Sequence, residues 1–535
     1  MIKRLIIKNF KGIKDADIIF DKAKNVIVGN NGVGKSTIIE ALTLAMGYGL
    51  NRLEVTPHLF HVDCIRDFKE SKQLPYISVE VFFDSGSAEF SGTNNSIHRL
   101  ENGLRLKISF DDEAFSELFD KEKDICKQIP CEYYKVERYW FSDTIVRQNL
   151  IPYHVLVIDS SSTYFNASSN QYIASILKKY IGTEDIITIR STLRQLSEDF
   201  DQYEKMQEVN TKLSKDSSDL RLSIDITSSI IFRNIICPFL NDIPIEQIGQ
   251  GDLCILKTML SLDKRHMNDK PKLIIIEEPE THLSHTKMYE LLRKIEDSSD
   301  ENTQLIITTH SNFVANKLDL SNLLLIDNNA GKIQVQKMDN RSTELTKFFT
   351  KVSNYPTLRL ILCKSAILVE GPTDEMIVTY YYKKTYNRHP FDDGIELISV
   401  EGVKFKQYAE LGKAFNKKIA IITDNDGMTY NEVLQKRGLN QLPESIHVYT
   451  ERNTTLNTLE PSFVEVNEEQ IQDLASVILP IRLKEPISKE KINKFMKNNK
   501  TEWAFRLLEN IEKYNFNVPE YIKNAINWLR TDARE

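Results

Sequence analysis

Two groups of residues in this 535-residue chain have the types and spacing needed for phosphate chemistry. The first is a glycine-rich run near the N-terminus, Gly29-Asn30-Asn31-Gly32-Val33-Gly34-Lys35-Ser36-Thr37. Its glycines let backbone amides turn toward phosphate oxygens, Lys35 supplies a positive charge, and Ser36 offers a hydroxyl to magnesium. The second group is acidic and lies toward the C-terminus. Together they predict a nucleotide site and a metal site that acts on phosphodiesters.

Further residues are expected to complete the nucleotide site. Glu277, which stands where an aspartate is usual, would hold magnesium, and Glu278 would orient the attacking water. The two glutamates follow an apolar strand expected at 272–276. His310 comes shortly after another, expected at 305–307, and could sense the γ-phosphate. The alternatives are that Glu277 and Glu278 form a solvated acidic turn and that His310 is a structural histidine.

A short glycine-containing run precedes the glutamates. It reads Ile248-Gly249-Gln250-Gly251-Asp252-Leu253 and is similar to a degenerate ABC signature loop. The amides around Gly249 and Gly251 could bind a γ-phosphate across an interface. The alternative is a surface turn before a helix.

The acidic group follows two apolar stretches that are expected to be neighbouring parallel strands. Glu370 ends the first, and Asp424 and Asp426 end the second, so all three should meet at one sheet edge. Asp374 lies one helical turn after Glu370 and can face the same pocket. Such carboxylates repel one another unless cations neutralise them, and Mg²⁺ or Mn²⁺ favours oxygen ligands.

Two residues later in the chain are weaker candidates for the same site. Glu460 could be a further metal ligand, or an ordinary acid in a loop. Lys500 could neutralise charge in a transition state, or be a solvated lysine. Two ions about 4 Å apart would activate water and stabilise the leaving oxygen.

The apolar pattern predicts elements that position these residues in an α/β fold. The glycine run should connect a strand at 25–28 to a helix at 36–46, after an earlier strand at 5–9. Antiparallel strands are expected within 76–110 and helices within 171–219. Alternating strands and helices from residue 365 predict a parallel sheet, with strands at 366–369, 395–400 and 419–422.

Composition narrows the function classes. A net charge of −7 excludes a globally basic nucleic-acid binder, so DNA contact would need a local basic patch. The lysines within 404–418 or 484–500 could form such a patch, or they could simply lie on solvated helix faces. The cysteines form no CxxC pair, which argues against a disulfide framework or a zinc site. With no secretory signal and no membrane-length apolar run, a cytoplasmic protein is expected.

Two motif sets resemble known domains. The N-terminal order, with Asn9-Phe10-Lys11-Gly12 before the glycine run, resembles ABC-class ATPases of the SMC-like and recombination-repair group. Those proteins complete each site with the signature loop of a second subunit, which implies a homodimer here. Glu370-Gly371 with Asp424-Asn425-Asp426 resembles the Toprim domain. The combination resembles the OLD (overcoming lysogenization defect) family of nucleases over nearly the whole chain.

That resemblance implies an organisation and a set of roles. Residues 1–165 and 236–354 would form the ATPase, 166–235 a helical dimerisation insertion, and 355–535 the Toprim nuclease. Two-metal DNA cleavage would use Lys500 as the transition-state cation and a set of carboxylate ligands: Glu370, Asp374, Asp424, Asp426 and Glu460. Some family members act in Gabija antiphage systems beside a helicase-like partner, and others accompany retrons.

The leading hypothesis is an ATP-regulated, divalent-metal-dependent DNA endonuclease in antiphage defence. One alternative is an ATP-gated DNA clamp or scaffold whose Toprim fold binds without cleavage. The other is a topoisomerase-like enzyme, which needs a tyrosine that forms a covalent bond to DNA. The sequence does not identify the DNA that is cleaved or the partner. It also does not show whether ATP activates or inhibits cleavage.

Overall fold

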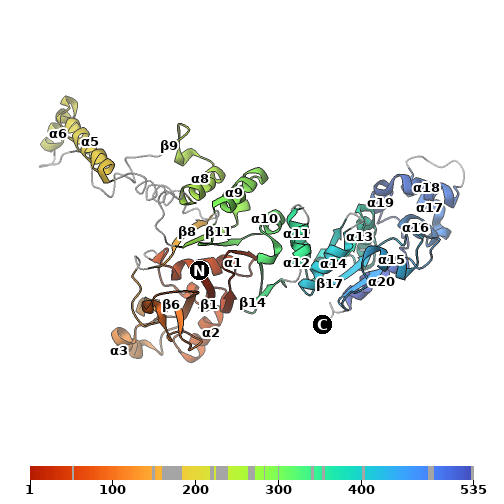
Figure 1. Ribbon diagram of the computed structural model, residues 1–535, viewed down its shortest axis with the longest axis horizontal. Coiled ribbons are helices and arrows are strands. Elements are labelled where there is room, and N and C mark those ends of the chain that lie inside the picture. The colour runs from red at the N-terminus through yellow and green to blue at the C-terminus, as the bar shows by residue number, and fades with distance from the viewer. Residues whose placement is uncertain are drawn as a thin grey trace. The chain divides into compact units, whose positions relative to one another are not determined.

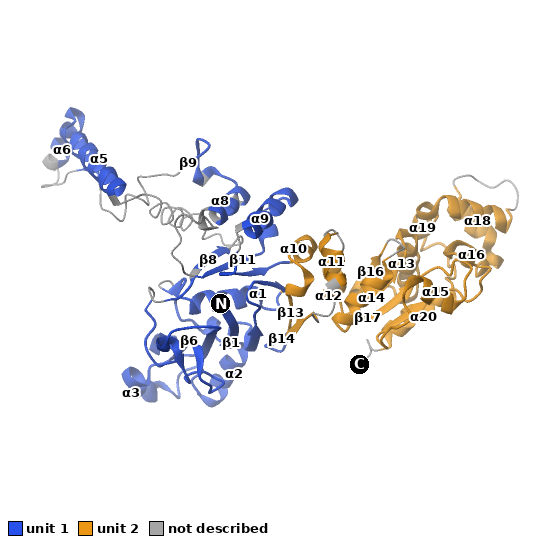
Figure 2. Ribbon diagram, in the orientation of Figure 1, with its two compact units in different colours: residues 1–27, 32–309, 328–334 blue, residues 28–31, 310–327, 335–535 orange. Residues whose placement is uncertain are grey.

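The computed structural model describes most of the chain in two compact units (Figure 2). Unit 1 comprises Met1–Ile27, Gly32–Thr309 and Asn328–Gln334, and unit 2 comprises Val28–Asn31, His310–Asp327 and Val335–Glu535. Within these limits the described residues are 1–50, 53–147, 151–159, 183–216, 222–224, 239–262, 271–281, 283–298, 300–338, 343–351, 356–400, 404–479 and 487–531. No helix in these ranges is long and apolar enough to span a membrane.

Unit 1 contains antiparallel strands in the order β5-β6-β4-β1-β2 at one end of a larger sheet, and β7 pairs with β6 (Figure 1). Helix α1 packs against β1, β4 and β6. The antiparallel strands predicted within 76–110 are confirmed. The strands are β1 (Ile2–Phe10), β2 (Ile13–Ile19), β4 (Ile77–Phe83), β5 (Ser91–Gly92), β6 (Glu101–Phe110) and β7 (Tyr134–Trp140).

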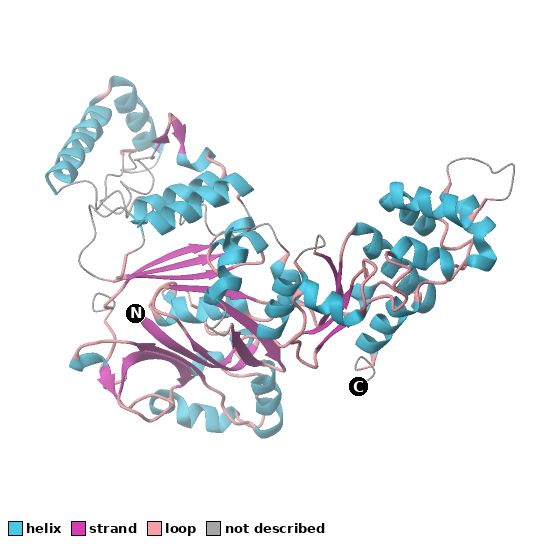
Figure 3. Cartoon of the chain, turned by 45° about the vertical axis from the view of Figure 1, so that its right-hand side comes forward, coloured by secondary structure: helices cyan, strands magenta, loops and turns pink. Residues whose placement is uncertain are grey.

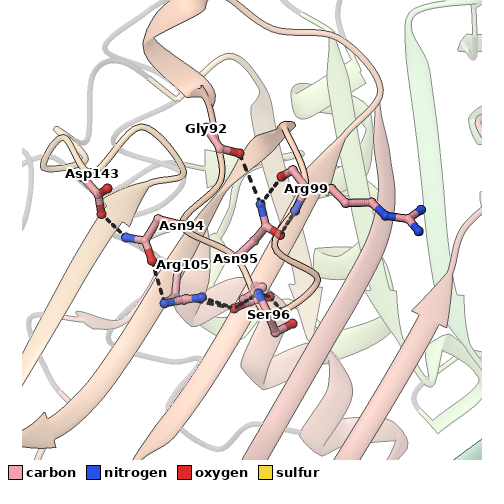
Figure 4. Close-up of polar contacts among 8 residues, drawn as sticks. Gly92, Asn94, Asn95, Ser96, Arg99, Arg105 and Asp143 are labelled. Atoms are coloured by element: carbon pink, nitrogen blue, oxygen red, sulfur yellow. Dashed lines mark hydrogen bonds and ion pairs between the residues drawn. The ribbon is translucent and has the colours of Figure 1, made fainter.

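A buried charge on β4 is fully paired in this sheet, and Figure 4 shows its partners Ser96 and Arg105. Glu80 is 2% exposed, and its carboxylate accepts hydrogen bonds from the amide and hydroxyl of Ser96 and from Arg105 Nε at 2.8 Å. Arg105 Nη1 donates to Asn94 Oδ1 at 2.8 Å. Nearby, Asn95 Nδ2 donates to two backbone carbonyls. The network joins β4 and β6 to the loop before β6.

A second set of strands in unit 1 is parallel, in the order β3-β12-β11-β8. They are β3 (Lys24–Val28), β12 (Thr303–Thr308), β11 (Lys272–Glu277) and β8 (His154–Asp159). Strands β11 and β12 are buried along their whole length, as expected where both faces of a parallel sheet are covered. The strands predicted around 25–28, 272–276 and 305–307 are thereby confirmed.

The helices of unit 1 include two that lie within the predicted insertion. The described part of 171–219 is helical, as α5 (Thr183–Gln202) and α6 (Glu204–Asp216), and the rest of that range lies outside the described residues. Helices α8 and α9 pack against each other. The other elements are α1 (Lys35–Ala45), α2 (Val62–Ser71), α3 (Asp112–Glu122), α8 (Gln250–Leu262), α9 (His285–Ser298), β9 (Phe239–Leu240) and β10 (Ile243–Pro244).

Unit 2 is built around a parallel sheet in the order β16-β15-β17-β18 (Figure 3). Its strands are β15 (Ser365–Val369), β16 (Ile395–Ser399), β17 (Lys418–Ile422) and β18 (Ile446–Tyr449). Helices α13 (Pro372–Tyr386) and α20 (Glu520–Arg530) pack against the sheet and each other. Helices α12 (Thr357–Leu362) and α14 (Phe405–Ala414) also pack against sheet strands and each other. The predicted alternation of strands and helices is confirmed.

The remaining elements complete unit 2 and its junctions. The predicted boundary at 354 and 355 lies outside the described residues, and the four-part division of the chain stays a prediction. The elements are α10 (Asn312–Lys317), α11 (Thr343–Lys351), α12 (Thr357–Leu362), α13 (Pro372–Tyr386), α14 (Phe405–Ala414), α15 (Tyr430–Arg437), α16 (Leu459–Glu465), α17 (Ile471–Ile478), α18 (Lys489–Asn498), α19 (Lys500–Glu509), α20 (Glu520–Arg530), β13 (Leu323–Asn329) and β14 (Lys332–Lys337).

Candidate nucleotide site and carboxylate centre

The glycine run connects the end of β3 to the start of α1, which is the strand, loop and helix arrangement that a phosphate-binding loop requires. Gly32 has φ 80° and Gly34, the N-cap of α1, has φ 105°. This left-handed region suits glycine because other residues carry a Cβ that is strained there. Ser36 and Thr37 lie in the first turn of α1, and their contacts with magnesium and the nucleotide stay predictions.

Lys35 lies among the carboxylates that follow β11. Its side chain is buried, and burial lowers the pKa of its ammonium group, while the negative charges of Glu278, Glu280 and Glu277 act in the opposite direction. Glu277 is the last residue of β11, and Glu278 has φ 39°. The structure therefore brings the predicted lysine and both predicted glutamates into one electrostatic group.

Glu280 was given no role by the sequence, although it lies only two residues after Glu278. Its Oε1 accepts a hydrogen bond from Thr309 Oγ1 at 2.9 Å, just beyond the end of β12. The Glu278 amide donates to the Thr308 carbonyl at 3.0 Å. These bonds fix the turn after β11 against the end of β12. His310 follows Thr309 directly, and its sensor role stays a prediction.

The signature-like run lies where α8 begins. Gly249 is exposed and precedes the helix, with open space where a Cβ would stand, and Gly251 is in its first turn. The amide of Leu253 donates to the Gly249 carbonyl at 3.1 Å. Both the surface turn and the signature loop are compatible with this geometry, so the contact with a second subunit stays a prediction.

The carboxylate centre forms at one edge of the unit 2 sheet. Strands β15 and β17 are parallel neighbours, so Glu370 and Asp424, which follow them, lie close together. Glu370 Oε1 accepts hydrogen bonds from Thr423 Oγ1 and from the Asp424 amide, the latter at 3.1 Å. Asp374 Oδ2 accepts from the Gly371 amide at 3.1 Å, which caps α13.

Burial and mutual repulsion favour the protonated forms of two of these acids. Burial raises the pKa of the Asp374 carboxyl to about 7, helped by the charges of Glu370 and Glu460. Burial also raises the pKa of Asp424 to about 8, helped by Asp374, Glu370 and Glu460 and opposed by Lys500. The structure thus brings together Lys500 and four of the five predicted ligands.

Asp426 is placed differently from the other predicted ligands. Its φ of 50° turns the chain after Asp424, and its carboxylate pairs with Lys436 at 3.1 Å and with Arg437 at 3.5 Å. Arg437 also pairs with Glu370, so it links the two acids. No local pattern marks Arg437 beyond its place at the basic end of α15. A ligand role for Asp426 stays a prediction.

The donor set suits a divalent cation, although the side chains do not surround one point. Within the described ranges, no three His, Cys, Asp or Glu residues are close enough to hold one ion. Holding an ion would therefore require the carboxylates to move toward one another. Glu460 is 2% exposed, and its Oε2 has no hydrogen-bond partner among the described residues. A buried, unpaired carboxylate oxygen beside two acids with raised pKa values fits hard-cation chemistry.

Two further residues of the centre, besides Arg437, were not found from the sequence. Tyr521 on α20 is buried, and burial together with the charges of Asp424, Asp374 and Glu451 raises its pKa. The backbone carbonyl of Glu451 accepts a hydrogen bond from Asn425 Nδ2 at 3.0 Å. Only the packing of α20 on the sheet brings Tyr521 here, and no local pattern marks it.

These features define a class of protein: an ATPase-type nucleotide-binding region followed by a Toprim-type carboxylate domain. Comparison with protein families agrees. Residues 24–316 match the family described as "AAA domain, putative AbiEii toxin, Type IV TA system", and residues 361–426 match "Overcoming lysogenization defect protein-like, TOPRIM domain". The first match covers more than half of the chain, which belongs to this AAA family and carries an OLD-like Toprim domain.

Several curated relatives match long stretches of this chain. Endonuclease GajA of Bacillus cereus is 22% identical over 64% of this chain and 62% of the relative, which is less than two thirds of its length. The Retron Ec83 probable ATPase of Escherichia coli is 20% identical over 60% of this chain and 70% of the relative. The OLD nuclease of Thermus scotoductus is 23% identical over 80% of this chain and 82% of the relative. The predicted α/β ATPase and Toprim architecture is confirmed.

Proposed function

We propose that this protein is an ATP-regulated, divalent-metal-dependent endonuclease that nicks or cuts duplex DNA. The observation that carries the proposal is the buried carboxylate group at the edge of the unit 2 sheet, with Glu460 Oε2 unpaired and Lys500 within electrostatic reach of Asp424. The names of two relatives, endonuclease GajA and OLD nuclease, support the same activity.

The carboxylates would hold the ions, and other side chains would prepare them. Glu370, Asp374, Asp424, Asp426 and Glu460 are the proposed ligands. Two Mg²⁺ or Mn²⁺ ions would supply an activated water and a charge that stabilises the leaving oxygen. Lys500 would neutralise negative charge that develops on the phosphate. Arg437 would hold Glu370 and Asp426 in position through its ion pairs.

The nucleotide site would regulate cleavage. Lys35 and the glycine run would bind the phosphates, Ser36 and Glu277 would hold Mg²⁺, and Glu278 would orient water. A homodimer would supply the signature-like loop around Gly249 and Gly251 from the second subunit. A role in antiphage defence, with a helicase-like or retron partner, is proposed from the similarity to GajA and to the Ec83 ATPase.

One observation favours a second function, an ATP-gated DNA clamp without cleavage. The described carboxylates do not converge on one point, so the centre would need to rearrange before it could hold an ion. A clamp would use the Toprim fold only as a binding surface. Cleavage remains the stronger proposal because a set of unused buried acids would destabilise the fold.

A plasmid assay separates these functions. Supercoiled plasmid is incubated with the purified protein and Mg²⁺ or Mn²⁺, with and without ATP, beside Asp424→Asn and the exposed control Asp473→Asn on α17. Metal-dependent nicked or linear product that disappears only in Asp424→Asn supports the nuclease. DNA retention with no product in any lane supports the clamp.

A further inference from the structure

A pocket opens beside the carboxylate centre, along β18 at the edge of the unit 2 sheet. Its volume is about 580 Å³, within the usual range for small-ligand sites. Helices α15 and α20 and the segment after β18 supply its walls, and Leu439 and Val448 are among its buried apolar lining residues. Tyr430, Tyr449 and Tyr521 also line it. The pocket therefore combines aromatic rings with a largely polar lining, beside the carboxylate centre.

One lining residue lacks the partner that its chemistry demands. Thr450 follows β18 and is 3% exposed, yet its Oγ1 makes no hydrogen bond with any described residue. A buried hydroxyl without a partner is unfavourable, because it has lost its hydrogen bonds to water. The oxygen itself is enclosed by its neighbours, so a polar group of a ligand would satisfy it only after the lining moves enough to expose it.

The aromatic side of the pocket has a cation placed over it. The Arg452 guanidinium carbon lies 4.0 Å from the centroid of the Tyr430 ring. Arg452 is exposed, and no ion pair joins it to a described carboxylate. Tyrosine rings and arginine planes are the groups on which proteins stack nucleobases, and an arginine at the rim can also meet a backbone phosphate.

The charge inside the pocket selects between a base and a phosphate. Two carboxylates, Glu451 and Glu520, line it against the single cation Arg452, so the interior disfavours an anion. The amides of Asn440 and Asn524 line it as well. Carboxylates and amides accept and donate hydrogen bonds at the edge of a base. A neutral heterocycle fits this lining better than a phosphate does.

The pocket is joined directly to the catalytic edge of the sheet. The Thr423 amide donates to the Tyr449 carbonyl at 3.1 Å, and Asn425 Nδ2 donates to the Glu451 carbonyl at 3.0 Å. Thr423 and Asn425 flank Asp424, and Tyr449 and Glu451 line the pocket. A base in the pocket would therefore keep its own strand beside the carboxylates.

We propose that this pocket binds one unstacked nucleobase of the DNA strand whose phosphate lies at the carboxylate centre. The proposal rests on the proposed nuclease function and adds a substrate requirement: the strand must offer a base that can leave its stack. Nicking at mismatches, bulges or single-stranded junctions would then be favoured, because extruding an unpaired base is least costly there.

The test measures binding of the full-length protein in Ca²⁺ to a duplex that carries one unpaired nucleotide. That nucleotide is either 2-aminopurine or an abasic site. We expect binding to quench the 2-aminopurine emission, and the abasic duplex to bind roughly tenfold more weakly, as stacking of one base predicts. Thr450→Val, which is nearly isosteric, and Tyr430→Leu should each reduce this difference. The control Gln435→Ala, exposed on α15, should retain it.

Each outcome decides the proposal. Equal affinity of the wild type for both duplexes, or an unchanged difference in both pocket variants, would overturn it. Loss of quenching on addition of free dAMP, with no difference between the duplexes, would assign the pocket to a free nucleotide and overturn it too. The plasmid assay is run in parallel with Mg²⁺. If the wild type cuts plasmid but binds both duplexes equally, only the pocket proposal is refuted. If it distinguishes the duplexes but never cuts, only the nuclease proposal is refuted.

Discussion

Replacing Asp374 with asparagine should stabilise the metal-free protein and abolish DNA cleavage. The Asp374 carboxyl has a pKa of about 7 in place of its ordinary 3.8, because it is buried beside Glu370 and Glu460. Since a tenfold change in proton affinity corresponds to about 1.4 kcal/mol, ionising this group in the folded protein costs at most about 4 kcal/mol. Asparagine removes the charge and keeps an oxygen for the Gly371 amide.

The sign of the pH dependence follows from the direction of the shift. A carboxyl whose pKa is higher in the folded state binds more protons there, so the free energy of unfolding falls as pH rises from about 4 to about 7. Asp424, with a pKa of about 8, acts in the same direction over a wider range. The advantage of Asp374→Asn over the wild type should therefore grow by about 2–3 kcal/mol between pH 5 and pH 8.

Urea unfolding in EDTA at pH 5, 6.5 and 8 measures this difference, with Asp473→Asn as the matched control on an exposed position. Adding Mg²⁺ should stabilise the wild type at pH 8 and have little effect on Asp374→Asn. A variant that is less stable than the wild type at pH 8 without metal would refute the reasoning. The Asp374 carboxyl would then stabilise the fold without metal, rather than serve as a ligand whose charge a bound cation neutralises.

Four other changes test separate parts of the structure. Lys35→Ala should lose ATP binding, measured by calorimetry, without changing metal-dependent DNA binding. Arg437→Gln should raise the Mg²⁺ concentration needed for half-maximal cleavage, because it releases the two carboxylates that it pairs. Glu80→Ala should lower the free energy of unfolding by about 3–5 kcal/mol, since it leaves Arg105 without its buried partner. Tyr521→Phe should retain cleavage and yield no covalent protein–DNA adduct, as assayed in denaturant.

The sequence predicted the parts of both sites that depend on local pattern. The glycine run, Glu277 and Glu370 all lie at strand ends, and the carboxyl ends of parallel strands must gather at one edge. Arg437 and Tyr521 could not be found in this way, because helices packed from distant parts of the chain bring them to the centre. Asp426 was predicted as a ligand, but its own left-handed backbone conformation directs its side chain toward Arg437. Sequence spacing alone does not reveal such a conformation.

Tyr521 also bears on how the phosphodiester would be broken. A topoisomerase-like reaction needs a tyrosine that ionises readily as it attacks phosphorus. Tyr521 lies within electrostatic range of the carboxylates, but burial and their negative charge raise its pKa above the ordinary value, which disfavours the phenolate. The same negative charge favours divalent cations, which can generate hydroxide from water. The electrostatics of the centre thus favour water over this tyrosine as the nucleophile, and hydrolysis over reversible strand transfer.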